Sequence, residues 1–470
     1  MKKQIDKSKE RAVYKQLYDY FVESINNGVY CDGDKLPSRR ELERQFGVSE
    51  TTVLSACRLL ENTGYLTSVP RKGYYIKSSV KVPEFNPKRE PKIFVDGRNV
   101  DERIAYSYNG TDNQLFKRSA YARIVREIAY NDEKDILRLG DKYGEQILRN
   151  AIAKYLYSFR GLRCNPDNII IGAGSEYTLV SLAAVLGNDT LFAVESPGEM
   201  RPYCALEDYG KKVVTIPPGC MCNLKEELEA CGANVVYTFP SFHFPDGYVM
   251  SDEQKSELIE WANTAPDKYI IEDDRDFGII RHKNKPIFEM DKNSRTIYFG
   301  TFIHSISSSF KISYMVLPDE LHDRWIHHHR YYHSLCSKLE QYALAEFIST
   351  GEFVTHYRKV RDLYRERRKY FKEQIKKSLN SIVEVLPESD ATSVIVKFNL
   401  DMTAGKIRHL CAQNGIKIYN ISMYTPDSWL YTADDNGKNE PPVFIFGIGH
   451  LSKHEIKYGA ELMGKVFEKL

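Results

Sequence analysis

The chain has 470 residues, of which 42% are hydrophobic and 28% are charged, and its formal net charge is +2. This composition excludes a disordered or globally basic chain, so a nucleic-acid-binding surface would have to be local. The first residues, MKKQIDKSKERAVY, contain no apolar signal-peptide core, and the nine cysteines are scattered without a disulfide pattern. We expect a cytoplasmic protein of two or three domains.

The N-terminal region contains two short predicted helices around a glycine turn. Ser38 and Glu41 form a capping box that begins one helix, Gly47 ends it, and Ser49 caps the next. Such a pair is typical of a helix-turn-helix, in which the second helix enters the major groove. The residues at 65–77 predict a β-hairpin wing. The alternative is a generic helical pair inside a larger fold.

The motifs LPSRRE, VSETTV, GYL and RKGYY follow one another in the order found in the winged helix of GntR-type regulators, which this region resembles. Residues 1–77 carry 14 Lys and Arg against 10 Asp and Glu, which agrees with a DNA partner. The resemblance implies DNA contacts by Ser38, Arg39, Arg40, Ser49, Glu50, Thr51, Thr52, Arg71, Lys72 and Gly73.

Two positions of this winged helix depart from the GntR pattern. Glu50 and Leu54 stand where many relatives have arginine. A glutamate cannot hold a phosphate, but it can accept a hydrogen bond from cytosine N4. We therefore expect an operator that differs from the common GntR operator.

Beyond the winged helix the composition changes twice. Residues 78–92, SSVKVPEFNPKREPK, are rich in proline and charge, which is typical of a tether. Helical and β-type segments alternate through residues 93–320, which predicts a mostly parallel sheet wrapped by helices. Residues 321–470 predict a smaller α+β domain. The β-type runs of the larger domain are 168–172, 190–194, 213–216, 235–239, 269–272, 297–299 and 312–317.

Five segments of the larger domain carry a second resemblance. They are GAGSEY (172–177), ESPGEMR (195–201), FPSFHFPDG (239–247), IEDDRD (271–276) and IYFGTFIHSISSSFKISYMVLP (297–318). They resemble the cofactor motifs of aspartate-aminotransferase-like enzymes that use pyridoxal 5′-phosphate (PLP). More closely, the chain resembles the MocR subfamily of GntR-type regulators. The implied fold is multidomain, with a winged helix-turn-helix, an α/β aminotransferase-like large domain and an α+β small domain.

The resemblance also implies which residues line the former cofactor pocket. Asp273 matches the carboxylate that pairs with the pyridinium nitrogen, and Ala173, Gly174 and Ser175 match the helix start that binds the phosphate. His304 stands at the position of the Schiff-base lysine. Because histidine cannot form a stable Schiff base, this alignment excludes covalent PLP.

Five other positions of the pocket also differ from the residues that bind cofactor or substrate in the family. Glu176 replaces a glutamine, Glu199 a stacking tyrosine, Arg275 a phenol donor, Lys311 a phosphate-binding arginine and His450 a substrate-binding arginine, whereas Arg201 matches some relatives. These mixed charges predict one of two sites. Either the side chains pair with one another in a site that binds nothing, or they form a pocket for a different small polar effector. Noncovalent PLP is a further alternative.

The sequence thus predicts a DNA-binding transcriptional regulator whose catalytically inactive aminotransferase-like domain dimerises and senses an effector. The expected partners are a double-stranded operator, a second copy of the chain and a small polar effector, with no cofactor and no membrane. One alternative is an aminotransferase-like enzyme or PLP-responsive regulator that holds PLP noncovalently. Another is a domain that serves only as a dimerisation scaffold.

Two further signals have unexceptional explanations. His327, His328 and His329 lie in a predicted helix at 320–348, where only His329 and His333 share a face, so a surface or interface helix is favoured over a metal site. The basic run at 358–377 is favoured as a solvated helix of the small domain over a nucleic-acid arm.

Overall fold

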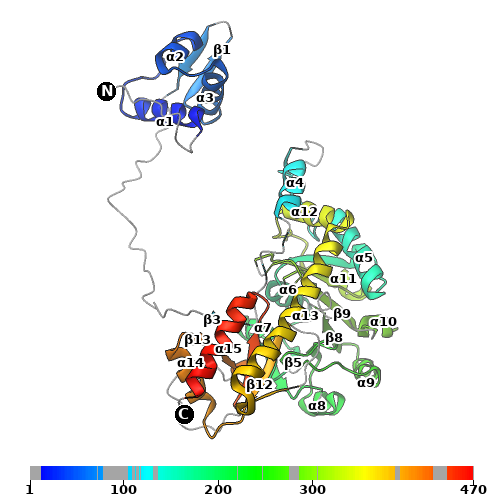
Figure 1. Ribbon diagram of the computed structural model, residues 1–470. Coiled ribbons are helices and arrows are strands. Elements are labelled where there is room, and N and C mark those ends of the chain that lie inside the picture. Colours follow the sequence, from blue (N-terminus) through cyan, green and yellow to red (C-terminus); the bar gives the residue numbers. More distant parts are fainter. Residues whose placement is uncertain are drawn as a thin grey trace. The chain divides into compact units, whose positions relative to one another are not determined.

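The computed structural model contains two compact units, Met1–Arg98 and Asn99–Leu470 (Figure 1). The predicted tether at 78–92 lies outside the described residues. The structure describes residues 12–70, 72–77, 104–107, 112, 116, 118–130, 136–219, 221–245, 247–274, 285–303, 305–307, 309–386, 392–426 and 442–468.

The N-terminal unit consists of three helices followed by a two-stranded antiparallel wing. Its elements are α1 (Val13–Asn26), α2 (Arg39–Phe46), α3 (Glu50–Asn62), β1 (Leu66–Val69) and β2 (Gly73–Ile76). The caps predicted from the sequence are present. Ser38 and Glu41 form a reciprocal capping box, Gly47 is left-handed at φ 64°, and the Ser49 side chain accepts from the Thr52 amide.

A small apolar core holds these five elements together. Leu17 and Phe21 of α1, Leu42 of α2 and Val53 and Leu60 of α3 are almost completely buried in one cluster. The cluster also contains one residue from each wing strand, so the wing is fixed against the helices. The unit therefore has a core of its own.

A seven-stranded sheet forms the centre of the second unit. Its order is β4-β10-β9-β8-β7-β5-β6, and β10 is antiparallel to both of its neighbours while the other pairings are parallel. The strands are β4 (Ile169–Ala173), β5 (Leu191–Glu195), β6 (Lys212–Ile216), β7 (Val235–Thr238), β8 (Tyr269–Asp273), β9 (Thr296–Thr301) and β10 (Ile312–Val316).

Both faces of this sheet are covered, which explains the continuous apolar runs in the sequence. Ile169 and Ile171 of β4 point into one apolar cluster, and Ile170 between them points into another. The surrounding helices are α4 (Arg118–Ala129), α5 (Gln146–Arg160), α6 (Ser175–Leu186), α7 (Met200–Asp208), α8 (Leu224–Cys231), α9 (Asp252–Ala262), α10 (Ile287–Met290), α11 (Asp319–His328) and α12 (Lys338–Ser349).

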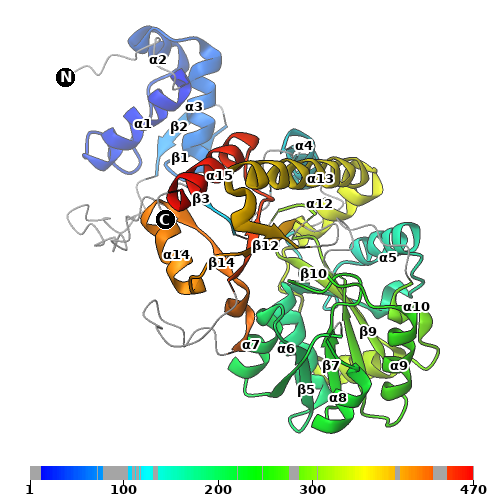
Figure 2. The ribbon, with the colours of Figure 1, turned by 60° about the horizontal axis from the view of Figure 1, so that its bottom comes forward.

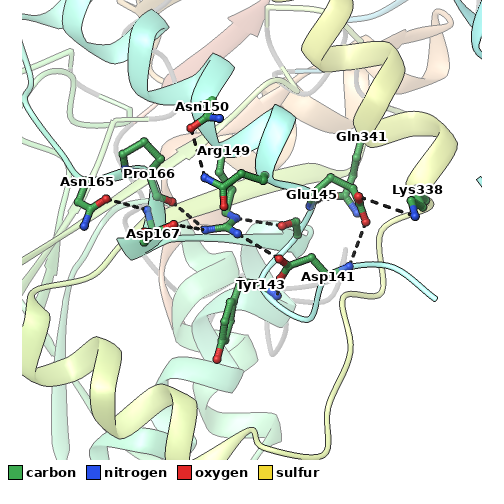
Figure 3. A network of polar contacts seen from close by, with 12 residues as sticks. Asp141, Tyr143, Glu145, Arg149, Asn150, Asn165, Pro166, Asp167, Lys338 and Gln341 are labelled. Carbon is green, nitrogen blue, oxygen red and sulfur yellow. Dashed lines mark hydrogen bonds and ion pairs between the residues drawn. The ribbon is translucent and has the colours of Figure 1, made fainter. Parts of the chain in front are cut away.

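The buried guanidinium of Arg149 ties the start of α5 to the segment before it (Figure 3). It donates to the Gly144 carbonyl at 3.0 Å, to Asp141 at 3.1 Å and to Asp167 at 3.2 Å. The amide of Ile171 in turn donates to the Tyr143 carbonyl at 2.8 Å. Arg149 therefore has a structural role, because these bonds fix β4, whose carboxyl end carries candidate site residues.

The C-terminal part of the second unit has a four-stranded antiparallel sheet of order β11-β12-β15-β14. Ile104 and Tyr106, which follow the predicted tether in sequence, pack in its core, and β3 (Ile104–Ala105) pairs with β13 (Ile416–Lys417). The remaining elements are α13 (Glu352–Leu379), β11 (Val383–Val385), β12 (Ser393–Phe398), α14 (Ala404–Gln413), β14 (Tyr419–Asn420), the short 3-10 helix η4 (Ile421–Tyr424), β15 (Val443–Gly447) and α15 (Lys453–Phe467).

The predicted continuous helix at 320–348 is wrong. The structure has two helices there, α11 and α12, separated by residues 329–337. Tertiary contacts account for the break, because the Cys336 thiol donates to the Gly172 carbonyl at 3.1 Å and Gln341 donates to the Cys336 carbonyl at 3.0 Å. His329 and His333 consequently do not share a helix face.

His329 has a packing role instead. Its ring stacks on Trp325 with a centroid distance of 3.9 Å, and burial, followed by the neighbouring His328, lowers its pKa to about 4. Within the described part of the chain, no three His, Cys, Asp or Glu side chains are placed to hold a metal ion. None of the described helices is long and apolar enough to cross a membrane.

Candidate functional site

The exposed face of α3 is the first candidate site. Glu50, Thr51, Ser55 and Arg58 are exposed on this helix, whereas Val53 is buried beneath them. Thr51, Ser55 and Arg58 follow one another at helical spacing, so they share one face. That face could contact base edges and phosphates in a major groove.

Hydroxyl groups and one ion pair organise the start of α3. The Ser49 hydroxyl lies 2.9 Å from the hydroxyls of both Thr51 and Thr52. Arg39 of α2 approaches Glu50 at 3.9 Å, with both side chains largely exposed. Glu50 therefore lies beside a cation that can orient its carboxylate.

The remaining predicted DNA contacts lie on α2 and the wing. Arg40 is exposed on α2, and Lys72 and Gly73 are exposed at the wing turn, where Gly73 has φ 104°. Arg71 lies outside the described residues. Sequence reasoning missed Ser55 and Arg58, although their spacing from Thr51 was a sufficient signal.

The second candidate site lies at the carboxyl end of β4. Here Gly172, Ala173 and Gly174 lead into α6, and Gly174 adopts φ 99° at its N-cap. A Cβ on Gly172 would lie 1.8 Å from the Thr178 hydroxyl, so glycine is required for this close approach. Ser175 begins α6 and is buried.

Three of the predicted pocket residues meet at this edge of the sheet and form an ion cluster. The guanidinium of Arg201 donates to both oxygens of Glu199, at 2.9 and 2.7 Å, and lies 3.8 Å from Glu176. The Ser175 hydroxyl donates to Glu176 at 3.3 Å. The side chains of Arg201, Glu199 and Glu176 are 27%, 10% and 40% exposed, so the cluster is accessible from one side.

Asp273 is buried at the end of β8, where it accepts a hydrogen bond from the Tyr237 hydroxyl. The next residue, Asp274, accepts from Arg160 at 2.7 Å and from Tyr298 at 2.6 Å. Sequence reasoning did not find Tyr237, Arg160 or Tyr298. Their separations from the two aspartates, up to 114 positions, leave no local signal.

Glu272 precedes these aspartates and is completely buried. Its carboxylate accepts from the amides of Ile287 at 3.0 Å and Phe288 at 2.9 Å. Burial, followed by the charge of Asp274, raises the pKa of Glu272.

The structure does not place His450 or Lys311 in the ion cluster. The Nε2 of His450 lies 3.0 Å from the Ala105 carbonyl, and burial lowers its pKa, so the ring is neutral at pH 7. Lys311 is exposed just before β10. Arg275 and His304 lie outside the described residues.

One residue of the C-terminal part reaches the ion cluster and was also missed. Tyr424 at the end of η4 accepts a hydrogen bond through its carbonyl from the Gly198 amide at 2.9 Å, and its ring packs edge-on against Phe244. Burial, followed by the Glu199 carboxylate, raises the pKa of Tyr424. The cluster thus lies where the two parts of the second unit meet.

Comparisons with known proteins agree with both halves of this architecture. Residues 13–76 match the gntR family of bacterial regulatory proteins. The uncharacterized HTH-type transcriptional regulator YdeL of Bacillus subtilis (strain 168) is 31% identical over 429 residues, covering 89% of this chain and 91% of its own. The probable rhizopine catabolism regulatory protein MocR of Rhizobium meliloti is 29% identical, covering 78% of each chain.

The second unit also matches solved enzymes. An archaeal alanine:glyoxylate aminotransferase superposes with a TM-score of 0.65 at 22% identity, covering 78% of this chain and 91% of that one. At this identity the match shows the fold alone.

A winged helix joined to an aminotransferase fold defines the class: the protein is a DNA-binding transcriptional regulator with an aminotransferase-like domain. More particularly, the chain belongs to the MocR subfamily of GntR-type regulators.

Proposed function

We propose that the aminotransferase-like domain of this regulator is catalytically inactive, binds a small polar effector at the ion cluster and joins two chains into a dimer. The regulator acts in the cytoplasm, where its operator lies. Effector binding shifts the population of arrangements of the two winged helices, and so changes which operator spacing is bound.

The chemistry of the pocket residues supports the absence of covalent PLP. Position 304 is a histidine, which has no primary amine for a Schiff base. The carboxylate of Glu176 lies beside Ser175 at the start of α6, where a helix favours an external anion. These residues do not fit a phosphate-bearing cofactor held through an aldimine.

One observation carries the effector proposal, namely the accessible fork between Arg201 and Glu199. The carboxylate of a zwitterionic ligand could displace Glu199 from Arg201. The amine of the same ligand could then pair with Glu176. Because Tyr424 of the C-terminal part reaches the same place, occupancy of the fork would change the contact between the two parts.

Exposed apolar side chains support the dimer. Leu137 and Leu139 are 93% and 73% exposed, and Tyr331 is 80% exposed in the segment between α11 and α12. Exposed apolar side chains that lie together are typical of an interaction surface, and Leu137 and Leu139 are two positions apart in the chain. We propose that a second copy of the chain covers them.

At the winged helix we propose that Arg40, Thr51, Thr52 and Lys72 hold phosphates or base edges and that Glu50 reads an exposed amine of cytosine. Arg39 supports this role, because its guanidinium lies 3.9 Å from the Glu50 carboxylate, whose oxygens can accept a hydrogen bond from cytosine N4.

Titration of operator affinity against a small-molecule library tests the effector proposal. Full-length protein is screened by thermal shift with amino acids and related zwitterions, and hits are added to an operator-binding assay. We expect a hit to stabilise the wild type, change operator affinity and lose its effect in Arg201→Lys, which keeps the charge but loses the fork. Hits that act equally on Arg201→Lys, or that leave operator affinity unchanged, would contradict the proposal.

Noncovalent PLP is a second candidate, favoured by buried Asp273 and by the glycine-rich turn at 172–174. If PLP binds noncovalently, it should change operator affinity and leave no lysine adduct after borohydride reduction. The effector proposal predicts no response to PLP.

A further inference from the structure

Basic and acidic side chains are segregated on α13. This helix carries ten Lys and Arg against four Asp and Glu, a net charge of +6. The unit Asn99–Leu470 as a whole carries 47 Lys and Arg against 51 Asp and Glu, so α13 is a local exception in an acidic unit. The helix lies on the surface of the unit beside α15 (Figure 2).

Seven of the cations fall on one side of the helix. At about 100° per residue, they lie within an arc of about 100° that contains no carboxylate. We name this set the basic stripe; its members are Arg358, Arg361, Arg365, Arg368, Lys369, Lys372 and Lys376. The four acidic residues of α13 lie outside this arc, and one of them, Glu366, pairs with Lys453 of α15 at 2.6 Å.

The buried face of α13 explains why the stripe is presented outward. Val360, Tyr364, Phe371 and Ile375 recur at helical spacing and are buried. The residues Arg358, Arg365, Lys369 and Lys376 are exposed. Among the described residues, none of these four has an ion-pair partner.

Such sorting is unfavourable for a helix that only faces water. Like charges separated by three or four positions destabilise a helix, and the stripe contains several such pairs, among them Arg365–Lys369 and Lys372–Lys376, whereas Arg361 pairs with Asp362 at 3.1 Å. An anion that lies along the stripe would relieve this repulsion.

We propose that the basic stripe binds the phosphate backbone of duplex DNA outside the operator. From Arg358 to Lys376 the helix rises about 27 Å, at about one stripe cation per 4 Å, which suits a polyanion with a charge every few ångströms better than a small ligand. The inference rests on the DNA-binding function, because the winged helix on the same chain brings duplex DNA to a high local concentration.

Two duplexes and two variants test the proposal. The short duplex is a 20-base-pair site selected by the full-length protein from a random library, and the long duplex contains that site with 30 base pairs on each side. The variant Arg365→Gln/Lys369→Gln/Lys376→Gln removes three exposed cations of the stripe. The control Lys154→Gln/Lys292→Gln/Lys406→Gln removes three exposed cations elsewhere on the unit.

On the long duplex we expect the stripe variant to bind about tenfold more weakly and to lose two to three units from the slope of log affinity against log salt, since each phosphate contact contributes about 0.9. The control variant should have wild-type affinity and salt slope on both duplexes. The stripe variant should have wild-type affinity and salt slope on the short duplex. The thermal unfolding midpoint of the stripe variant should be equal to or above wild type, because repulsion is relieved.

Equal slopes for wild type and the stripe variant on the long duplex would overturn the proposal. Vesicles containing phosphatidylserine provide a second arm. Loss of vesicle binding with unchanged DNA binding would assign the stripe to a membrane surface and also overturn it. Failure of the DNA-binding function itself is distinguishable, because wild type would then not bind the short duplex.

Discussion

At the scale of single residues, the side chain of Arg201 determines the properties of the ion cluster. It satisfies the nearly buried carboxylate of Glu199 through two hydrogen bonds and lies within 3.8 Å of Glu176. The guanidinium is the cation that both carboxylates approach, Glu199 at 2.7 Å and Glu176 at 3.8 Å. The fork therefore has both a structural role and the proposed binding role.

Replacing Arg201 by methionine should lower the free energy of unfolding by about 2 kcal/mol, because the nearly buried Glu199 carboxylate loses both hydrogen bonds from the guanidinium. The double variant Glu199→Gln/Arg201→Met should recover part of the loss. Urea denaturation measures both. The exposed pair between Lys212 and Asp189 provides the control, and Lys212→Met should change stability by less than about 0.5 kcal/mol. An Arg201→Met protein as stable as wild type would contradict this role.

Glu272 predicts a pH dependence of stability. Burial raises its folded pKa above the unfolded value of 4.5, to about 7, so folding favours the protonated form. The stability that protonated Glu272 contributes to the fold is fully present below pH 4.5 and is lost as the pH rises through about 7. Between pH 5.5 and 8, the unfolding free energy of wild type should fall by about 2 kcal/mol more than that of Glu272→Gln. Parallel pH profiles for the two proteins would show that Glu272 does not titrate in this range.

At the scale of elements, the caps and turns that place the recognition helix follow directly from local sequence. Ser49 begins α3 and Gly47 ends α2, so the exposed face of α3 is fixed by residues that are close in the chain. Because Thr51 and Arg58 lie on that face, the contacts proposed for α3 depend on one short, well-capped element.

Thr51→Ala and Arg58→Ala should each weaken operator binding by about 1–3 kcal/mol without changing the fold. Fluorescence anisotropy with the selected 20-base-pair duplex measures the affinity, and circular dichroism checks the fold. Lys15→Ala on α1 is the control and should bind as wild type. Full affinity in both α3 variants would show that this face does not contact DNA.

Elements were predictable where local signals determine them. Each apolar run of the large sheet predicted a strand within one or two residues, because buried strands read as continuous apolar segments. The predicted helix at 320–348 was wrong because contacts of Cys336 with Gly172 override local propensity. At the candidate site, family resemblance brought Glu176, Glu199 and Arg201 together. It could not supply Tyr424, which lies more than 200 positions away.

At the scale of the whole molecule, the proposed function requires two chains. Leu137, Leu139 and Tyr331 are among the large apolar side chains that one chain leaves exposed. A two-fold dimer would present two winged helices, which matches the two half-sites of a palindromic operator.

Leu137→Glu/Tyr331→Glu should convert the dimer into a monomer and weaken binding to a two-half-site operator, because two charges would be buried at the interface. Light scattering after size exclusion measures the mass. Tyr209→Glu changes another exposed aromatic residue, 65% exposed after α7, and should leave the dimer intact. A dimeric double variant would place the interface elsewhere.

Covalent trapping determines whether the aminotransferase-like domain holds PLP through a lysine, which the proposed function excludes. Full-length protein is incubated with excess PLP and freed of unbound PLP by gel filtration. Its absorption spectrum is recorded before and after reduction with borohydride, and the reduced protein is mapped by peptide mass spectrometry. We expect no visible absorption band and no pyridoxyl adduct on Lys311 beyond that found on the exposed Lys292. A visible band that disappears on reduction, with stoichiometric label on one lysine of the domain, would contradict this expectation.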